Sequence, residues 1–326
     1  MVTQSEGTVQ PGETSKLARR ASASPRIQNE MVPADDFEQD DTDSSLGSDT
    51  ESSTASVSAS ILEYRRRQGR TYHSDKFTSN YFLPNDDQQV ESMDLTHHYL
   101  TLLLDGQLFL PPLETDSIKR VLDVGTGSGI WAIEFADRYP DTEVIGTDLS
   151  PCQPQWVPPN LRFEIDDADW NALFKEAYRC CAPGGWVQSA EADVRFRSDD
   201  GSTELEPIFK IYQKLFEEGS RIIGNPFFVH ELQQKAFEQA GFTDIKTMDY
   251  KFPVGGWPKD PKLAAIGQFV QTTLENDLEG YTLMMWQDVC KWPEDEYQVA
   301  LMSLRKAIRN PKVHSYMTVR YVYGRK

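Results

Sequence analysis

A glycine-rich turn between an apolar strand and a helix is the feature that most constrains how this 326-residue chain can fold. The run reads Val121-Leu-Asp-Val-Gly-Thr-Gly-Ser-Gly129. A strand is expected over residues 120–124 and a helix over 130–139. Glycine lets the backbone turn sharply and approach a ligand closely. A turn of this composition between a strand and a helix therefore predicts a ligand-binding loop.

The chain around this loop alternates strands with helices at short intervals. Such alternation predicts parallel strands joined by right-handed crossovers, the α/β class with a Rossmann-like sheet. Pro183-Gly184-Gly185 ends one of the expected helices, and Asp86-Asp87 offers an N-cap for another. Further strands are expected at 143–147, 161–165 and 186–190, and helices at 61–69, 86–105, 170–181, 204–223 and 229–240.

The spacing of the glycines separates two cofactor classes. A dinucleotide fingerprint, G-x-G-x-x-G, would place its third glycine at position 130, whereas here it stands at Gly129. Asp123 near the loop would also repel a pyrophosphate. S-adenosylmethionine (SAM) has no phosphate and carries a cationic amino group, which an acidic residue attracts. The pattern favours SAM, and a nucleotide-dependent oxidoreductase is the disfavoured alternative.

Acidic residues occur at the ends of three consecutive expected strands. Ligands of open α/β sheets bind at the carboxyl ends of strands, so we expect these acids to lie around one cofactor. Asp148 is expected to hold the ribose hydroxyls and Asp167 to lie near the adenine edge. Each acid taken singly also suits a strand-end or cap position. The predicted cofactor-binding residues are Asp123, Gly125, Thr126, Gly127, Gly129, Asp148 and Asp167.

The run from Arg120 to Pro154, including Gly146-Thr-Asp-Leu-Ser-Pro, resembles the fungal LaeA/UMTA-type SAM-dependent methyltransferases. The resemblance implies a seven-strand methyltransferase sheet whose last two strands, here 243–253 and 314–323, are antiparallel. It also implies a methyltransferase domain over 61–326, with a helical insertion at about 257–312 that caps the acceptor site. Other matching segments are Gly69-Arg-Thr-Tyr-His73, Pro183-Gly-Gly-Trp186, Ser198-Asp-Asp-Gly201, Trp257-Pro-Lys-Asp-Pro261 and Val322-Tyr-Gly-Arg-Lys326.

The chain departs from the family pattern after its third expected strand. The family has a fourth strand and a helix at this point, but here Glu164-Ile-Asp-Asp167 runs almost directly into Asp169-Trp170. A strand and crossover helix need at least about 10–12 residues and do not fit. We expect residues 186–190 to pair instead with 121–124, which gives a six-stranded sheet. A more open cofactor cleft and weak or absent methyl transfer follow from this expectation.

Residues 1–60 are expected to be a disordered acidic tail. They contain 18 Ser or Thr, and their 11 acidic and 4 basic residues contribute −7 of the net charge of −18. Such a segment buries too little apolar surface to offset the entropy lost on ordering. The acidic balance disfavours direct nucleic-acid binding. No apolar run suggests a membrane span or a signal peptide, so a cytoplasmic or nuclear protein is expected.

No catalytic residue can be assigned from the sequence, and the four cysteines lack metal-ligand spacing, so no metal is expected. Methyl transfer relies mainly on alignment and exclusion of water, and a general base is optional. Glu191 and Asp193 are candidates for the acceptor side, or else ordinary exposed acids. The acceptor is a small molecule or a protein. The alternative function is a catalytically impaired regulator of secondary metabolism that acts through regulatory protein partners.

Overall fold

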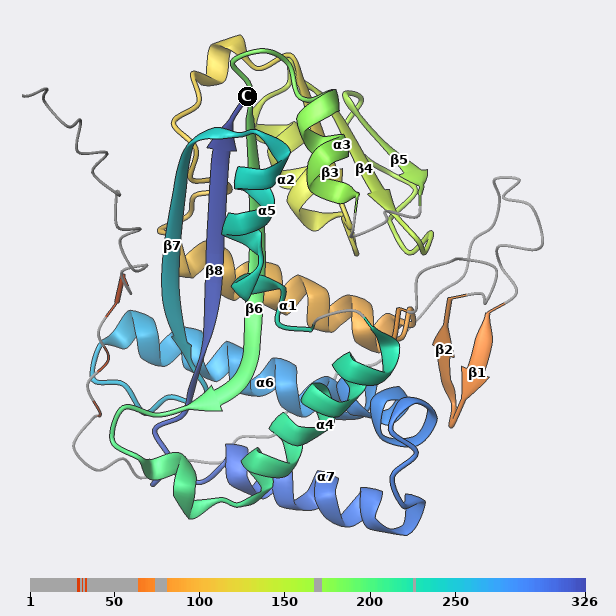
Figure 1. Ribbon diagram of the computed structural model, residues 1–326, viewed down its shortest axis with the longest axis vertical. Helices are drawn as coiled ribbons and strands as arrows, with labels where there is room; N and C mark the ends of the chain where they lie inside the picture. Colours follow the sequence, from red (N-terminus) through yellow and green to blue (C-terminus); the bar gives the residue numbers. More distant parts are fainter. Residues whose placement is uncertain are drawn as a thin grey trace, which may run out of the picture.

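The computed structural model describes residues 28, 29, 31, 33, 64–73, 81–166, 172–224 and 227–326. Apart from four of its residues, the expected disordered tail at 1–60 lies outside this part of the chain. Among the described residues, no helix is long and apolar enough to cross a membrane. Apart from a short hairpin, Figure 1 shows two groups of strands, with the parallel strands at one end of the molecule and helices α4, α6 and α7 at the other.

The first group is a parallel sheet of three strands that carries the glycine-rich loop. Its order is β3 (Arg120–Val124), β4 (Glu143–Asp148) and β5 (Leu161–Ile165). Helix α2 (Ile130–Arg138) packs on one face, where Val144 is fully buried. The opposite face is open: Leu122 is 55% and Val124 43% exposed. This sheet therefore confirms the predicted parallel α/β arrangement but is covered on one side only.

The second group is an antiparallel sheet of three long strands. β8 (Tyr316–Arg325) lies at its centre, between β6 (Trp186–Arg197) and β7 (Thr243–Pro253). The predicted antiparallel pairing of the last two strands is confirmed. Helices α3 (Leu173–Cys180) and α5 (Gln233–Ala240) pack on this sheet in a cluster that includes Phe237 of α5 and Phe242, which follows α5.

The predicted pairing of residues 186–190 with 121–124 is wrong. β6 pairs with β8, and β3 pairs only with β4 among the described strands. The reason lies in α3, which has eight residues, shorter than the helix expected from the sequence. The rings of Phe174 and Tyr178 in α3 contact Phe237 and Phe242. Because α3 packs beside the antiparallel sheet, the strand that follows it, β6, joins that sheet. The six strands thus form two sheets rather than one.

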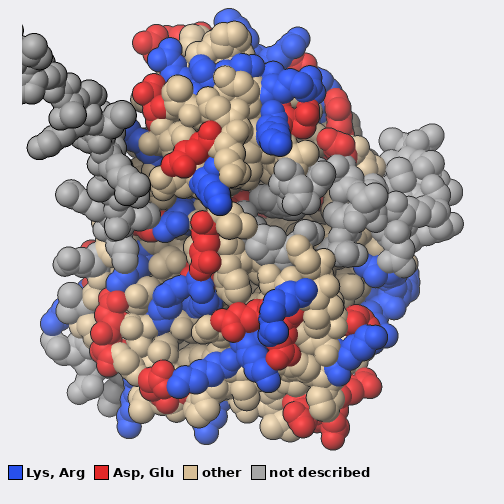
Figure 2. Space-filling view, in the orientation of Figure 1, with Lys and Arg blue, Asp and Glu red and all other residues tan. Residues whose placement is uncertain are grey.

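The largest hydrophobic core lies under the antiparallel sheet and is mostly helical. Helices α1 (Asp87–Leu103) and α4 (Ile208–Ile223) enclose it together with three elements of the 261–308 region. These are α6 (Pro261–Met284), a π-helical turn (Met285–Val289) and α7 (Glu294–Ile308). Short 3₁₀ turns complete the fold at Thr115–Ser117, Ser202–Leu205 and Val229–Glu231. Figure 2 shows acidic and basic side chains interspersed over one face of the molecule.

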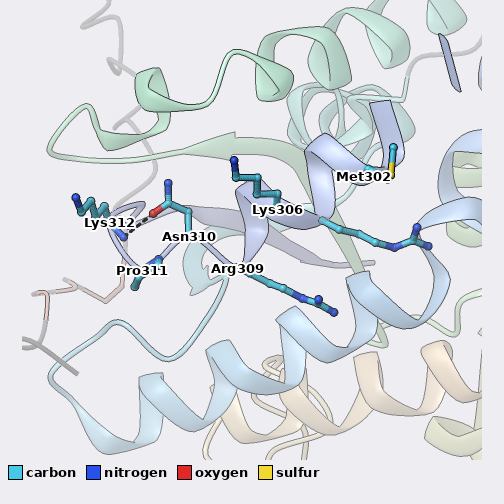
Figure 3. A pocket seen from close by; sticks show the side chains of 7 residues that line it. Met302, Lys306, Arg309, Asn310, Pro311 and Lys312 are labelled. Atoms are coloured by element: carbon cyan, nitrogen blue, oxygen red, sulfur yellow. Dashed lines mark hydrogen bonds between the residues drawn. The ribbon is translucent and has the colours of Figure 1, made fainter. Parts of the chain in front are cut away.

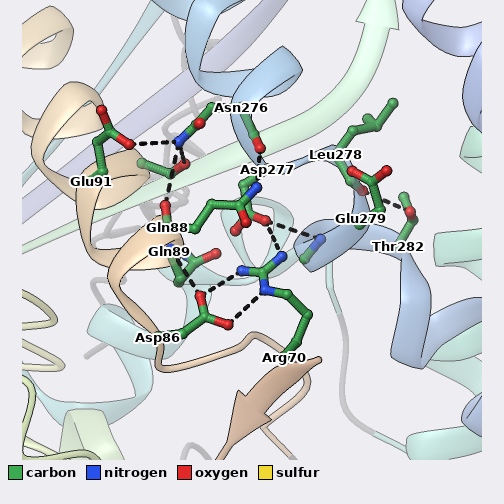
Figure 4. Close-up of polar contacts among 12 residues, drawn as sticks. Arg70, Asp86, Gln88, Gln89, Glu91, Asn276, Asp277, Leu278, Glu279 and Thr282 are labelled. Atoms are coloured by element: carbon green, nitrogen blue, oxygen red, sulfur yellow. Dashed lines mark hydrogen bonds and ion pairs between the residues drawn. The ribbon is translucent and has the colours of Figure 1, made fainter. Parts of the chain in front are cut away.

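Residues 65–72 form a β-hairpin, not the helix expected at 61–69. β1 (Arg65–Arg67) and β2 (Arg70–Tyr72) are joined by Gln68 and Gly69, whose φ angles of 46° and 84° suit a two-residue hairpin turn. Arg70 fixes the hairpin to two helices (Figure 4): its guanidinium pairs with Asp86, the N-cap of α1, and with the fully buried Asp277 in α6.

Candidate cofactor site

The three glycines of the loop all have left-handed backbone angles. The φ values are 72° at Gly125, 57° at Gly127 and 84° at Gly129, which is the N-cap of α2. Residues with a side chain rarely adopt such angles, so glycine suits all three positions. The path of the backbone from β3 into α2 therefore depends on the spacing of the three glycines.

The surroundings of the three glycines differ. A Cβ on Gly125 would meet no atom within 4 Å, whereas one on Gly127 would lie 3.0 Å from the sulfur of Met93 in α1. A Cβ on Gly129 would collide with the ring of Phe163 in β5. Gly127 and Gly129 therefore allow close packing of protein on protein. Gly125 leaves open space beside the loop for a ligand.

Most of the loop's described N–H groups donate to the protein itself. The N–H groups of Gly125 and Thr126 both donate to the carbonyl of Thr147, at 2.8 and 2.9 Å. Gly127 N–H donates to a carboxylate oxygen of Asp148 at 2.9 Å, and Gly129 N–H to the Thr126 carbonyl. A pyrophosphate site needs such groups turned toward the ligand. The loop therefore suits a cofactor without phosphate.

Asp148, at the end of β4, has carboxylate capacity left for a ligand. Its Oδ2 accepts the Gly127 N–H and its Oδ1 accepts the Ser150 N–H at 3.0 Å. The Leu149 N–H also bonds to this carboxylate, and an ionised carboxylate has about four acceptor positions, so capacity for a ribose hydroxyl remains. Burial raises the pKa of Asp148, although the backbone N–H groups and nearby His73 oppose that rise.

Asp123 lies in β3 just before the loop. Thr126 Oγ1 donates a hydrogen bond to its Oδ2 at 2.6 Å. Burial, with a contribution from the Asp148 charge, raises the pKa of Asp123 to about 6, against the lowering effect of Thr126. The carboxyl is mostly ionised at neutral pH, so it can attract the cationic amino group of SAM. The two acids and the open side of Gly125 fit this cofactor.

Residues near the site that were not predicted come from other segments. His73, after the hairpin, and Tyr81 have rings 5.8 Å apart, and the Asp148 charge contributes to the raised pKa of Tyr81 after the larger effect of burial. Gln153 donates to the Gly127 carbonyl at 2.7 Å. His73 belongs to the Gly69–His73 segment of the family resemblance, which was the only sequence signal for it.

The remaining candidates have separate locations. Asp167 lies outside the described residues, which stop at Asp166 before α3. Glu191 lies on β6, where burial raises its pKa to about 7. Asp193, two residues on, is buried; burial alone would raise its pKa, but hydrogen bonds from Arg195 and Arg197 lower it. Asp193 is thus fully engaged in ion pairs, whereas the Glu191 carboxyl is bonded only through the Ser189 hydroxyl at 3.3 Å among the interactions described for it.

Comparison with known proteins identifies several similar sequences. Residues 95–169 match the model of a methyltransferase domain family. The methyltransferase pytC of Aspergillus terreus is 31% identical over 291 residues, which cover 82% of this chain and 89% of pytC. The secondary metabolism regulator LAE1 of Cochliobolus heterostrophus is 28% identical, with 77% and 91% covered. The protein-methionine methyltransferase laeA of Emericella nidulans is 27% identical, with 81% and 77% covered.

Among solved structures, a phosphoethanolamine N-methyltransferase of Haemonchus contortus bound to SAM is similar. The sequence identity is 15% and the TM-score 0.35, and the match covers 76% of this chain and 54% of the other.

Proposed function

Since this chain belongs to the family of SAM-dependent methyltransferases that includes pytC and the LaeA proteins, we propose that it methylates a small-molecule or protein acceptor connected with secondary metabolism. The observation that carries the proposal is the glycine-rich loop. Its N–H groups donate to Thr147 and Asp148, and the two nearby acids suit a cationic cofactor.

Each cofactor-binding residue has a proposed part. Asp123 attracts the amino group and Thr126 holds the Asp123 carboxylate in place. Asp148 accepts from the ribose hydroxyls while it also fixes Gly127. Gly125 gives the cofactor a close approach. Gly127 and Gly129 shape the loop against Met93 and Phe163, and Asp167 is assigned to the adenine edge.

The cofactor supplies an electrophilic methyl group, and the protein orients the partners and excludes water. The helical region of α6 and α7 is the proposed acceptor cap. Glu191 is the acid available for taking a proton from an acceptor, because its pKa of about 7 suits a base near neutral pH. Asp193 is held by two arginines and serves the fold.

A calorimetric titration of the full chain with SAM, S-adenosylhomocysteine and NAD tests the cofactor. We expect binding of the first two and none of NAD. Release of S-adenosylhomocysteine in the presence of an acceptor then tests transfer. Binding of NAD in preference to SAM would overturn the proposal.

A second function is favoured by the split of the strands into two sheets. In this alternative the chain binds SAM but transfers methyl groups weakly or not at all, and acts as a regulator through protein partners. The same measurements separate the two functions. If the chain binds SAM saturably but does not methylate any acceptor that a full seven-strand relative methylates, the regulator is supported.

A further inference from the structure

The outer edge of β7 is covered by residues from the start of the chain. Among the described strands, β7 pairs only with β8, so its other side presents backbone N–H and C=O groups that need partners. On this side the Gln28 N–H donates to the Asp249 carbonyl at 2.8 Å. Figure 1 shows the segment in red beside β7. We call its four described residues, Gln28, Asn29, Met31 and Pro33, the edge cap.

Asn29 makes two hydrogen bonds to a single residue of β7. Its side-chain amide donates to the Lys251 carbonyl at 2.5 Å and accepts the Lys251 N–H at 2.7 Å. The amide thus satisfies both backbone groups of one edge residue, as a neighbouring strand would. A substitution at Asn29 therefore removes both bonds while the sequence of β7 stays intact.

Two further residues hold the edge cap in place. Met31 is partly buried and packs against the largest hydrophobic cluster. Pro33 forms an antiparallel β-bridge with Pro258, which follows β7 in the chain. The edge cap therefore combines backbone pairing, side-chain hydrogen bonds and apolar packing.

The charged side chains next to the edge cap are engaged with other residues. A lysine on an edge strand commonly keeps other strands away. Here, however, the Lys251 ammonium pairs with Asp199 and lies 4.3 Å from the centre of the Tyr316 ring. Both carboxylate oxygens of Asp249 accept hydrogen bonds from Arg320. The edge cap, and not these two side chains, therefore covers the backbone of β7.

A second copy of β7 fits the edge that the cap covers. The strand pairs with β8 without interruption from Lys246 to Pro253, so its outer side is a regular template. An antiparallel pair of identical strands is related by a two-fold axis and therefore matches itself. β7 contains two aspartates and two lysines, so it is neutral in a chain with a net charge of −18. Two copies of this strand therefore do not repel each other.

We propose that the edge cap blocks the pairing of β7 with β7 of a second copy of this chain. Because the edge cap belongs to the same chain, it reaches the edge without diffusion and competes well against a second molecule. Loss of the edge cap leaves the backbone groups of Lys251 unpaired, and an unpaired strand edge pairs with another strand.

Asn29→Ala tests the contact of the edge cap with β7, because alanine can make neither hydrogen bond to Lys251. Residue-resolved hydrogen exchange is measured on the full chain in dilute solution. The Lys251 N–H is expected to exchange about tenfold faster in the variant than in the unsubstituted chain. The N–H of Tyr250 faces β8 and should exchange as before.

Sedimentation in concentrated solution tests the pairing of two copies. In 1 M NaCl the Debye length is about 3 Å, so repulsion between the acidic molecules is screened. Asn29→Ala should then form more dimers than the unsubstituted chain at the same concentration, and dimer formation should restore slow exchange at Lys251.

Asn310→Ala is the matched control. This asparagine also accepts a backbone N–H through its side chain, that of Lys312 at 3.0 Å, and it lines a hollow at the C-terminal end of α7 (Figure 3). Its variant should match the unsubstituted chain in dimer content and in exchange at Lys251.

Three results would overturn the proposal. Equal exchange at Lys251 in Asn29→Ala and in the unsubstituted chain would mean that the edge cap does not form in solution. Exposed Lys251 without additional dimers would mean that this edge does not pair with a second copy. Dimers in which the Lys251 N–H still exchanges fast would assign the association to another surface.

Discussion

Asp123 lies buried before the glycine-rich loop, and its pKa of about 6 makes cofactor binding sensitive to mild acid. The carboxylate attracts the cofactor only when ionised, so affinity is present above pH 6 and lost as the pH falls through that value. Between pH 7 and pH 5 the ionised fraction falls about tenfold, and the dissociation constant for SAM is expected to rise by about the same factor. Calorimetry across this range measures it.

The Asp123→Asn variant is the control for this pH dependence. It keeps the shape of the side chain but has no proton to gain, so its weaker affinity for SAM should stay flat from pH 5 to pH 7. An equally steep curve in the variant would assign the titration to another group.

Asp148 is predicted to contribute hydrogen bonds to the ribose. Asp148→Ala should weaken SAM binding by about 1.5–3 kcal/mol, the range for hydrogen bonds to a charged group. Because Asp148 also accepts the Gly127 N–H, part of the loss comes from a loosened loop. Asp141 is an exposed aspartate in the turn before β4, and Asp141→Ala should bind SAM normally. If Asp148→Ala also binds SAM normally, another residue holds the sugar.

For single residues, the sequence predicted which ones form the loop but not which side chains contact them. Glycine spacing and strand-end acids are local signals, and the positive φ angles at Gly125, Gly127 and Gly129 agree with them. The contact of Met93 with Gly127 and the approach of His73 to Asp148 join segments that are distant in the sequence. Only the tertiary fold brings these segments together.

Valine side chains on the parallel sheet differ in how deeply they are buried, so two matched substitutions can test which part of the sheet is covered. Val144 in β4 is fully buried and Val124 in β3 is 43% exposed. Val144→Thr places a hydroxyl in the core and should cost about 1–3 kcal/mol of unfolding free energy. Val124→Thr should change it by no more than about 0.5 kcal/mol. Equal costs in urea titrations would mean that the β3 face is covered in solution.

Arg70 connects the hairpin to α1 and α6 through two carboxylates, one of which, Asp277, is fully buried. Removing one partner of a buried ion pair leaves an uncompensated charge, so Arg70→Ala should destabilise the fold by about 3–5 kcal/mol. The neighbouring Arg67 pairs with Asp288 at an exposed position. Arg67→Ala should cost less than about 1 kcal/mol. Similar unfolding midpoints for the two variants would contradict this role of Arg70.

The elements show where sequence reasoning succeeded and failed. The β7 strand was predicted over its full extent, and of the predicted capping pair Asp86-Asp87 it is Asp86 that caps α1. The apolar β3 strand was expected at the centre of a sheet, because residues on both of its faces are apolar. Among the described strands it pairs only with β4, so the pattern gave the wrong position. The hairpin at 65–72 was not predicted, because an arginine-rich segment lacks the alternation of apolar and polar residues that indicates a strand.

The molecule has cores of unequal size, so its two ends should differ in local stability. The parallel sheet has a small apolar cluster around Phe135 and Val144, whereas β8 and the helices share a far larger one. Hydrogen exchange is expected to be slowest in β8, which has a partner strand on both sides, and faster in β3. Slower exchange in β3 than in β8 would show that the parallel sheet is the more stable end.

The open side of β3 also affects how copies of this protein behave at high concentration. Among the described strands β3 pairs only with β4, and the exposed face of their sheet carries Leu122 and Val124, so two molecules can adhere there. The net charge of −18 gives every copy the same sign, so the molecules repel one another before such edges meet. Dissolved salt weakens that repulsion but leaves the apolar attraction intact. The colloidal behaviour of the protein in a concentrated solution therefore follows from a strand with a single neighbour in the part of the chain that the structure describes.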